Sequence, residues 1–187
     1  MRLRIVSGSL KGRVLSLSAK DNQHFRPTLE RVREAVLEIL KYDLQGSIVA
    51  DLCAGSGVMG FEMLSRGAVK VDFVEKERRL SAQITKNAAV LKAEQRVQVF
   101  CTDVRSFIDS AQKRYNLIFF DPPYNSSELA ELVPTLHDLL LPQGIVVYER
   151  RRHSQEKKSL KEEKNNVLID KRVFGDTTVE IFRFLNY

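Results

Sequence analysis

Four residues suited to chemistry, Asp121, Pro122, Pro123 and Tyr124, directly follow the apolar run at 117–120. The Asp121 carboxylate can accept one hydrogen of a flat aromatic amine. The Pro122 carbonyl, which the next proline holds in extended geometry, can accept the other. Because such an amine is a poor nucleophile until its hydrogens are held, and because the Tyr124 ring can stack on a base, the motif indicates methyl transfer to an exocyclic amine of a nucleobase. The alternative is an acidic turn after a buried strand, since Asp and Pro are ordinary turn residues.

Upstream of this motif, acids and glycines fall at the ends of the strands that the apolar pattern predicts. In an open α/β sheet the ligand lies at the carboxyl ends of the strands. Gly55 and Gly57 allow a tight turn that approaches a ligand without a Cβ in the way. Glu75 can accept hydrogen bonds from two ribose hydroxyls, Asp103 can meet an adenine amine, and Asp51 suits the positively charged amino acid end of S-adenosylmethionine. The predicted cofactor-binding residues are Asp51, Ala54, Gly55, Gly57, Glu75, Asp103 and Asp121.

The same glycines also match a dinucleotide fingerprint, Gly55-x-Gly57-x-x-Gly60, which makes an NAD-dependent oxidoreductase a rival interpretation. A pyrophosphate-binding turn usually begins directly after its strand, whereas the residues at 51–54 intervene here and add a carboxylate where phosphate charge would lie. The plainer alternative is a strand-to-helix turn, with Glu75 and Asp103 as helix caps. The joint occurrence of these residues with the motif at 121–124 favours the methyltransferase interpretation.

The chain has 187 residues and a formal net charge of +6, which fits one domain and a polyanionic partner. Residues 1–45 carry nine Lys or Arg against five acids, and residues 150–172 carry nine against four. These segments predict a basic rim around a site, although a solvated charged surface has the same composition. The predicted RNA-binding residues are Arg2, Arg4, Lys11, Arg13, Arg26 and Arg31.

Cys53 and Cys101 are the two cysteines, and neither stands in a metal-ligand spacing. We therefore expect free thiols, no metal and a reducing compartment. No apolar run approaches the ~20 residues of a membrane span, and the N-terminus lacks the apolar core of a signal peptide. The sequence predicts a cytoplasmic protein with no membrane partner.

The apolar periodicity predicts an α/β fold with a mostly parallel seven-stranded sheet. Short strands at 3–6 and 13–17 form a hairpin arm, and a helix capped by Thr28 ends near Gly46. Strands at 48–52, 71–75, 97–101 and 117–120 then alternate with helices at 58–65, 77–91 and 104–111. A helix at 126–140 and a strand at 145–149 follow, and strands at 167–174 and 178–185 form a C-terminal antiparallel hairpin around Gly175-Asp176. We divide the chain into an N-terminal extension, 1–45, and a cofactor-binding domain, 46–187.

With these motifs in place, the sequence resembles the class I, Rossmann-like S-adenosylmethionine-dependent methyltransferases, and within them the RsmD-like guanine-N2 methyltransferases of bacterial small-subunit ribosomal RNA. Ser7, Ser9 and Cys53 depart from residues common in the family. The resemblance rests on Arg4 to Gly8, Lys11 to Arg13, Arg26 to Thr28, Arg31 to Glu34, Asp51 to Gly57, Glu75, Thr85 to Asn87 and Asp121 to Tyr124.

The resemblance implies a monomeric enzyme that uses S-adenosylmethionine and methylates one guanine of small-subunit rRNA in an assembled or nearly assembled subunit. Asp121, Pro122 and Tyr124 are its implied catalytic residues. Three alternatives stay open: a DNA adenine-N6 methyltransferase, which shares the motif but usually adds a target-recognition domain; a protein glutamine methyltransferase, which would favour Asn at position 121; and a non-catalytic RNA-binding assembly factor.

Overall fold

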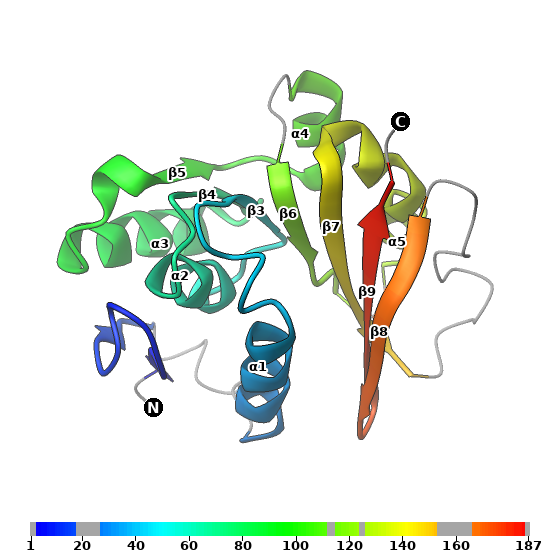
Figure 1. Cartoon of the computed structure of the whole chain (residues 1–187). Coiled ribbons are helices and arrows are strands. Elements are labelled where there is room, and N and C mark those ends of the chain that lie inside the picture. The colour runs from blue at the N-terminus through cyan, green and yellow to red at the C-terminus, as the bar shows by residue number, and fades with distance from the viewer. Residues whose placement is uncertain (1–2, 18–26, 112–114, 124–125, 153–165, 186–187) are drawn as a thin grey trace.

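The computed structural model describes residues 3–17, 27–111, 115–123, 126–152 and 166–185 (Figure 1). Tyr124, Arg2 and Arg26 of the predicted site therefore lie outside the described residues. In the described part, no helix is both long and apolar enough to cross a membrane.

A seven-stranded sheet forms the centre of the fold, as the sequence predicts, with the order β5-β4-β3-β6-β7-β9-β8. Within this sheet the strands β3 to β7 run parallel, and β9 is antiparallel to both β7 and β8. This arrangement confirms the mostly parallel sheet with a C-terminal antiparallel hairpin. The strands are β3 Ile48–Leu52, β4 Lys70–Val74, β5 Val97–Phe100, β6 Tyr115–Phe120, β7 Leu140–Arg151, β8 Asn166–Phe174 and β9 Thr177–Phe184.

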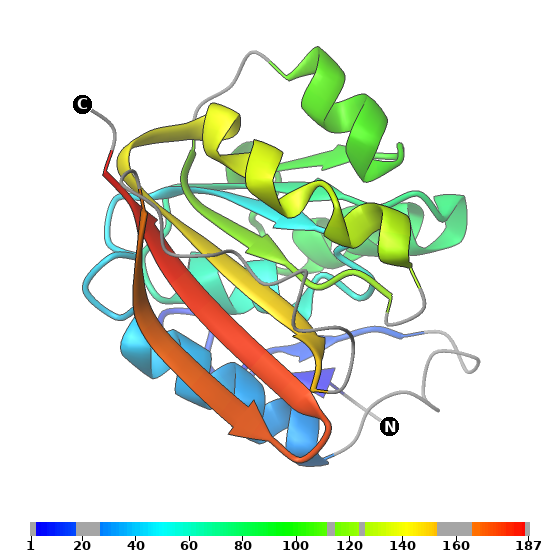
Figure 2. The ribbon, with the colours of Figure 1, turned by 90° about the vertical axis from the view of Figure 1, so that its right-hand side faces the viewer.

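Helices cover both faces of the sheet, which explains why its central strands are almost wholly apolar. On one face α1 and α2 pack with α3 over a core that contains Val36, Phe61 and Ile84. On the other face α4 and the segment after β6 enclose a core with Phe107 and Leu136, and Figure 2 shows the sheet between the two layers. The helices are α1 Pro27–Ile39, α2 Val58–Ser65, α3 Arg78–Val90, α4 Val104–Ser110 and α5 Ser127–Ala130, with 3₁₀ turns η2 Glu94–Arg96 and η3 Val133–Leu139.

Two local predictions are wrong, and proline explains both. The helix predicted over 126–140 is divided into α5 and η3. Pro134 has no N–H to donate and its ring would clash with the carbonyl four residues earlier, at Ala130, where α5 ends. The predicted cap Thr28 lies inside α1, because the helix begins at Pro27, a residue favoured in the first helical position.

The N-terminal arm, residues 3–15, pairs β1 Leu3–Arg4 with β2 Val14–Leu15 in antiparallel fashion. Ile5 and Leu15 are at most 1% exposed and belong to the same core cluster as α1 and α2. Gly8 has φ +80°, and a Cβ there would lie 2.1 Å from the Ser65 carbonyl oxygen. The arm therefore packs closely against the end of α2.

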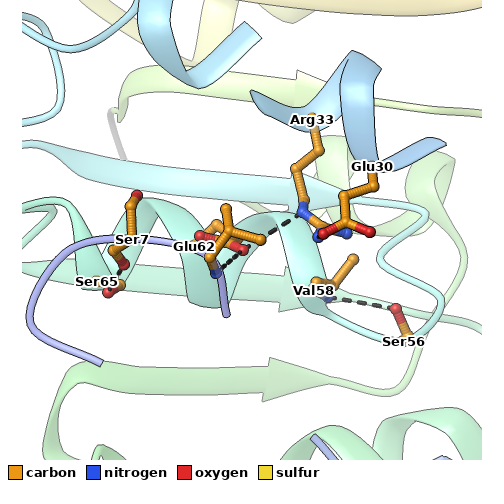
Figure 3. A network of polar contacts seen from close by, with 8 residues as sticks. Ser7, Glu30, Arg33, Ser56, Val58, Glu62 and Ser65 are labelled. Carbon is orange, nitrogen blue, oxygen red and sulfur yellow. Dashed lines mark hydrogen bonds and ion pairs between the residues drawn. The ribbon is translucent and has the colours of Figure 1, made fainter. Parts of the chain in front are cut away.

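Polar contacts fasten the arm to the helices beneath it (Figure 3). The Val6 amide donates to Oε1 of Glu62 at 2.8 Å, and the Leu10 amide donates to Oγ of Ser65 at 2.9 Å. Glu62 is fully buried, and the same Oε1 lies 3.4 Å from Nε of Arg33 on α1. One buried carboxylate on α2 thus connects the arm with α1.

Candidate active site

The turn between β3 and α2 depends on residues with left-handed backbone geometry. Cys53, Gly55 and Gly57 have φ of 59°, 55° and 74°. A Cβ on Gly57 would lie 3.1–3.2 Å from three buried core side chains, so close packing as well as backbone geometry favours glycine there. Burial raises the pKa of the Cys53 thiol to about 12, with a further contribution from the negative Glu75. The thiol is therefore neutral at physiological pH.

Glu75 follows β4 directly and holds the glycine turn against that strand. Its Oε2 accepts a hydrogen bond from the Gly55 amide at 2.8 Å, and its Oε1 accepts one from the Glu77 amide at 2.8 Å. Glu75 also lines the large cavity at this edge of the sheet. Because a carboxylate oxygen can accept more than one hydrogen bond, this acid can hold the turn and still receive ligand hydroxyls.

Asp51 lies behind the turn and is not among the residues that line the cavity. Its Oδ2 accepts a hydrogen bond from the Gly60 amide at 2.9 Å, and burial raises the pKa of its carboxyl well above the usual range. A Cβ on Gly60 would lie 2.3 Å from the Phe73 ring. The third glycine of the fingerprint thus serves close helix-to-sheet packing.

A cavity of about 1250 Å³ extends along the carboxyl ends of the strands. At one end it is lined by residues that follow β3, β4 and β5; Asp121 and Pro122 lie after the central strand β6, and residues of β7 and of the β8–β9 turn line the other end. Ala54 and Gly57 shape the turn but do not line the cavity. The lining includes Gly55, Glu75, Leu80, Thr102, Asp103, Arg105, Asp121, Pro122, Glu149, Arg151, Phe174 and Thr177.

Asp103 is a helix cap, one of the two roles that the sequence allowed, and it also lines the cavity. It is the N-cap of α4, where its carboxylate accepts from the Ser106 amide at 2.9 Å and from the Ser106 hydroxyl at 2.7 Å. These hydrogen bonds lower the pKa of Asp103. The residue is exposed and lines the cavity at the end of β5, so its ionised carboxylate is accessible to a ligand.

Asp121 has a carboxyl neighbour that the sequence analysis missed. Because Phe120 on β6 is paired with Tyr148 on the parallel strand β7, the next residues, Asp121 and Glu149, lie side by side, the first just after β6 and the second two residues before the end of β7. Burial raises the pKa of Asp121 to about 7. Burial is also the main cause that raises the pKa of Glu149 to about 9, and repulsion by Asp121 adds a smaller contribution. A buried acid in the strand at 145–149 was visible in the sequence, but its position beside Asp121 depends on the strand order.

The predicted RNA-binding residues that the structure describes are exposed and lie away from the cavity lining. The arm contacts Glu62 and Ser65 towards the end of α2, whereas the cavity lies at the opposite end of that helix, after β3. In the second basic segment, Arg150 is buried in an ion pair with Glu180 at 3.0 Å, so the predicted basic rim is wrong at this residue. The predicted RNA-binding residues that are exposed and away from the cavity are Arg4, Lys11, Arg13 and Arg31.

The fold and this site agree with the similarity of the chain to known proteins. The putative rRNA methyltransferase YlbH of Bacillus subtilis is 31% identical over 97% of this chain and 98% of its own length. Ribosomal RNA small subunit methyltransferase D of Escherichia coli is 35% identical over 73% of this chain and 68% of its own length. A solved structure, the putative methyltransferase yhhF from Escherichia coli, superposes with a TM-score of 0.86 at 27% identity over the whole of both chains.

A family profile described as Conserved hypothetical protein 95 matches residues 3–183, nearly the whole chain. The chain therefore belongs to this family, that of the RsmD-like methyltransferases.

Proposed function

We propose that this protein is an S-adenosylmethionine-dependent methyltransferase that modifies the exocyclic N2 amine of one guanine in small-subunit ribosomal RNA. The observation that carries this proposal is the position of Asp121 and Pro122 in the middle of a cavity that continues on both sides of them. A volume of about 1250 Å³ exceeds the range usual for a single small ligand, and so supports a site for two reactants.

The half of the cavity before Asp121 fits the methyl donor. The left-handed turn at Gly55 exposes backbone to a ligand, and Glu75 and Asp103 offer carboxylate oxygens for ribose hydroxyls and an adenine amine. When bound, S-adenosylmethionine supplies a methyl group on sulfonium, and its C–S bond breaks with the electron pair going to sulfur as the amine nitrogen forms the C–N bond. We expect Glu75→Ala to weaken cofactor binding by no more than about 3 kcal/mol.

Asp121 and Pro122 hold and polarise the acceptor amine. The carboxylate accepts one amine hydrogen and the proline carbonyl accepts the other, which directs the nitrogen lone pair towards the methyl group. As the new bond forms the amine becomes acidic, and its proton passes to the Asp121 carboxylate. Tyr124 is proposed to stack on the base once that base has left its helix.

The RNA substrate is proposed from the relatives and from charge. The Escherichia coli relative is named as a small-subunit rRNA methyltransferase. The arm residues Arg4, Lys11 and Arg13 are exposed, and so can contact phosphates at a distance from the cavity. We propose that the protein acts as a monomer in the cytoplasm, on an assembled or nearly assembled subunit large enough to reach both regions.

The test is transfer of radiolabelled methyl from S-adenosylmethionine to small subunits that lack their native base methylation, with naked rRNA and DNA in parallel. We expect label in N2-methylguanosine. Asp121→Ala should abolish transfer while leaving cofactor binding largely intact, and Asp109→Asn, at an exposed position on α4, should match the wild type. Label in DNA adenine alone, or normal turnover by Asp121→Ala, would overturn the proposal.

A further inference from the structure

Glu149 is a buried carboxyl that the proposed mechanism does not use. It is 4% exposed and lines the cavity on the side of Asp121 away from the cofactor half. Among the described residues, no hydrogen bond or ion pair engages its side chain. Burial of a carboxyl without a hydrogen-bond partner lowers the stability of the protein, because the group loses its hydration.

The orientation of Glu149 follows from its strand. Side chains two residues apart on a strand leave the same face of a sheet. Val147, two residues before Glu149, and Val179, its partner on β9, both belong to the core cluster beneath α1 and α2. Glu149 therefore leaves the sheet towards this same face, at its carboxyl edge, beside Asp121.

Asp121 and Glu149 are neighbouring carboxyls to which no described residue donates a side-chain or backbone hydrogen bond, and this defines the chemistry of the ligand that fits between them. Burial raises the pKa of both carboxyls, and a ligand edge that carries N–H donors in a row lowers it again, because hydrogen bonds to a carboxylate favour its ionised form. In guanine the ring N1–H stands directly beside the N2 amine. In adenine and cytosine the ring nitrogen beside the amine carries a lone pair, which would face the carboxyl and be repelled.

We propose that Glu149 accepts the N1–H of the target guanine while Asp121 and Pro122 hold its N2 amine, and that Glu149 thereby selects guanine over bases with an acceptor at that position. This inference rests on the proposed function and identifies the residue that recognises the N1–H group of the guanine ring. Glu149 is a specificity-determining residue that touches the substrate base beside the reacting nitrogen.

The test uses 2-aminopurine, which keeps the exocyclic amine but has a lone pair in place of N1–H. Reconstituted small subunits would carry either guanine or 2-aminopurine at the nucleotide that the wild-type protein methylates. The wild type should prefer guanine by about ten- to a hundred-fold in kcat/KM, the effect of one hydrogen bond to a carboxylate that is ionised in the complex with guanine. Because 2-aminopurine also lacks O6, the comparison between protein variants is the decisive result.

Glu149→Gln should reduce that preference to within about threefold, because an amide can turn its NH₂ group towards the lone pair of 2-aminopurine. Glu94→Gln, at an exposed position in η2, should keep the wild-type preference. Cofactor binding and thermal unfolding would show that each variant is folded. Should Glu149→Gln fail to fold, Glu149→Asp serves instead: its shorter side chain should lower the preference, and a preference equal to that of the wild type would overturn the inference.

Failure of the inference can be distinguished from failure of the proposed function. If the wild type forms N2-methylguanosine but Glu149→Gln keeps the full preference, Glu149 does not read N1–H and only the inference is lost. If the wild type forms no N2-methylguanosine on any guanine-containing subunit, both are overturned.

Discussion

Removal of the buried carboxylate of Glu62 should release the N-terminal arm and lower the stability of the whole protein. In Glu62→Ala the Val6 amide loses its 2.8 Å acceptor, and a buried donor left without a partner costs about 1–3 kcal/mol. Arg33, only 5% exposed, loses the carboxylate 3.4 Å from its Nε. Removing one partner of a buried ion pair costs about 3–5 kcal/mol.

The two losses overlap, because the arm can move and hydrate the amide. We therefore expect a total decrease in the free energy of unfolding of about 3–5 kcal/mol. For a chain of this size, the melting temperature should fall by roughly 6–20 °C. The assay is urea unfolding followed by circular dichroism, combined with hydrogen exchange at the Val6 amide, which should become fast in the variant.

Two further variants test the reasoning. Glu62→Gln keeps an oxygen that can accept from the Val6 amide, and so should be less damaging than Glu62→Ala. Glu38→Ala removes an exposed carboxylate on α1 that pairs with Lys41 at the surface, and should leave the unfolding midpoint unchanged. A Glu62→Ala midpoint equal to that of the wild type, with the Val6 amide still protected, would refute this account of how the arm is held.

Other perturbations test the turn, the acid and the arm. Gly60→Ala places a Cβ 2.3 Å from the Phe73 ring and should cost about 1–3 kcal/mol in thermal unfolding; an unchanged melting temperature would contradict the packing described. The single-turnover rate of methyl transfer should rise as the pH rises through about 7, because in the proposed mechanism only the ionised Asp121 carboxylate can take the amine proton, and a rate independent of pH would argue against that role. Replacement of Lys11 and Arg13 by Gln should weaken RNA binding and reduce the slope of log K against log salt by up to about 2, whereas an unchanged slope would remove the arm from the interface.

Much of the fold was predictable because the period of apolar residues changes at nearly every boundary. The strand at 48–52 and the helix at 58–65 match β3 and α2 at both ends. The hairpin around Gly175 was predictable from the turn residues between two strand-like runs. The helix predicted over 126–140 was wrong because apolar spacing continues through Pro134, where the backbone cannot continue the helix.

The site was predictable where a residue type has one strong local reason to be present. Gly55 and Glu75 fall at strand ends, and the structure joins them by a hydrogen bond. Glu149 was not predicted as a site residue, because its position beside Asp121 depends on the pairing of β7 with β6. The sequence pattern does not specify this contact between segments. Arg150 was misread for a similar reason: its buried partner, Glu180, is contributed by β9, thirty residues later.

The order of the cavity along the sheet edge has a genetic consequence. Among the described residues, those that line the cavity before Asp121 fall between positions 53 and 105, and the others fall between 121 and 177. Under the proposed function, the two reactants are served by consecutive, non-overlapping stretches of the gene, which meet in the connection between α4 and β6. We expect that recombination at that junction would exchange the acceptor specificity as a unit and keep the methyl donor, a simple route by which one scaffold could acquire new nucleic acid targets.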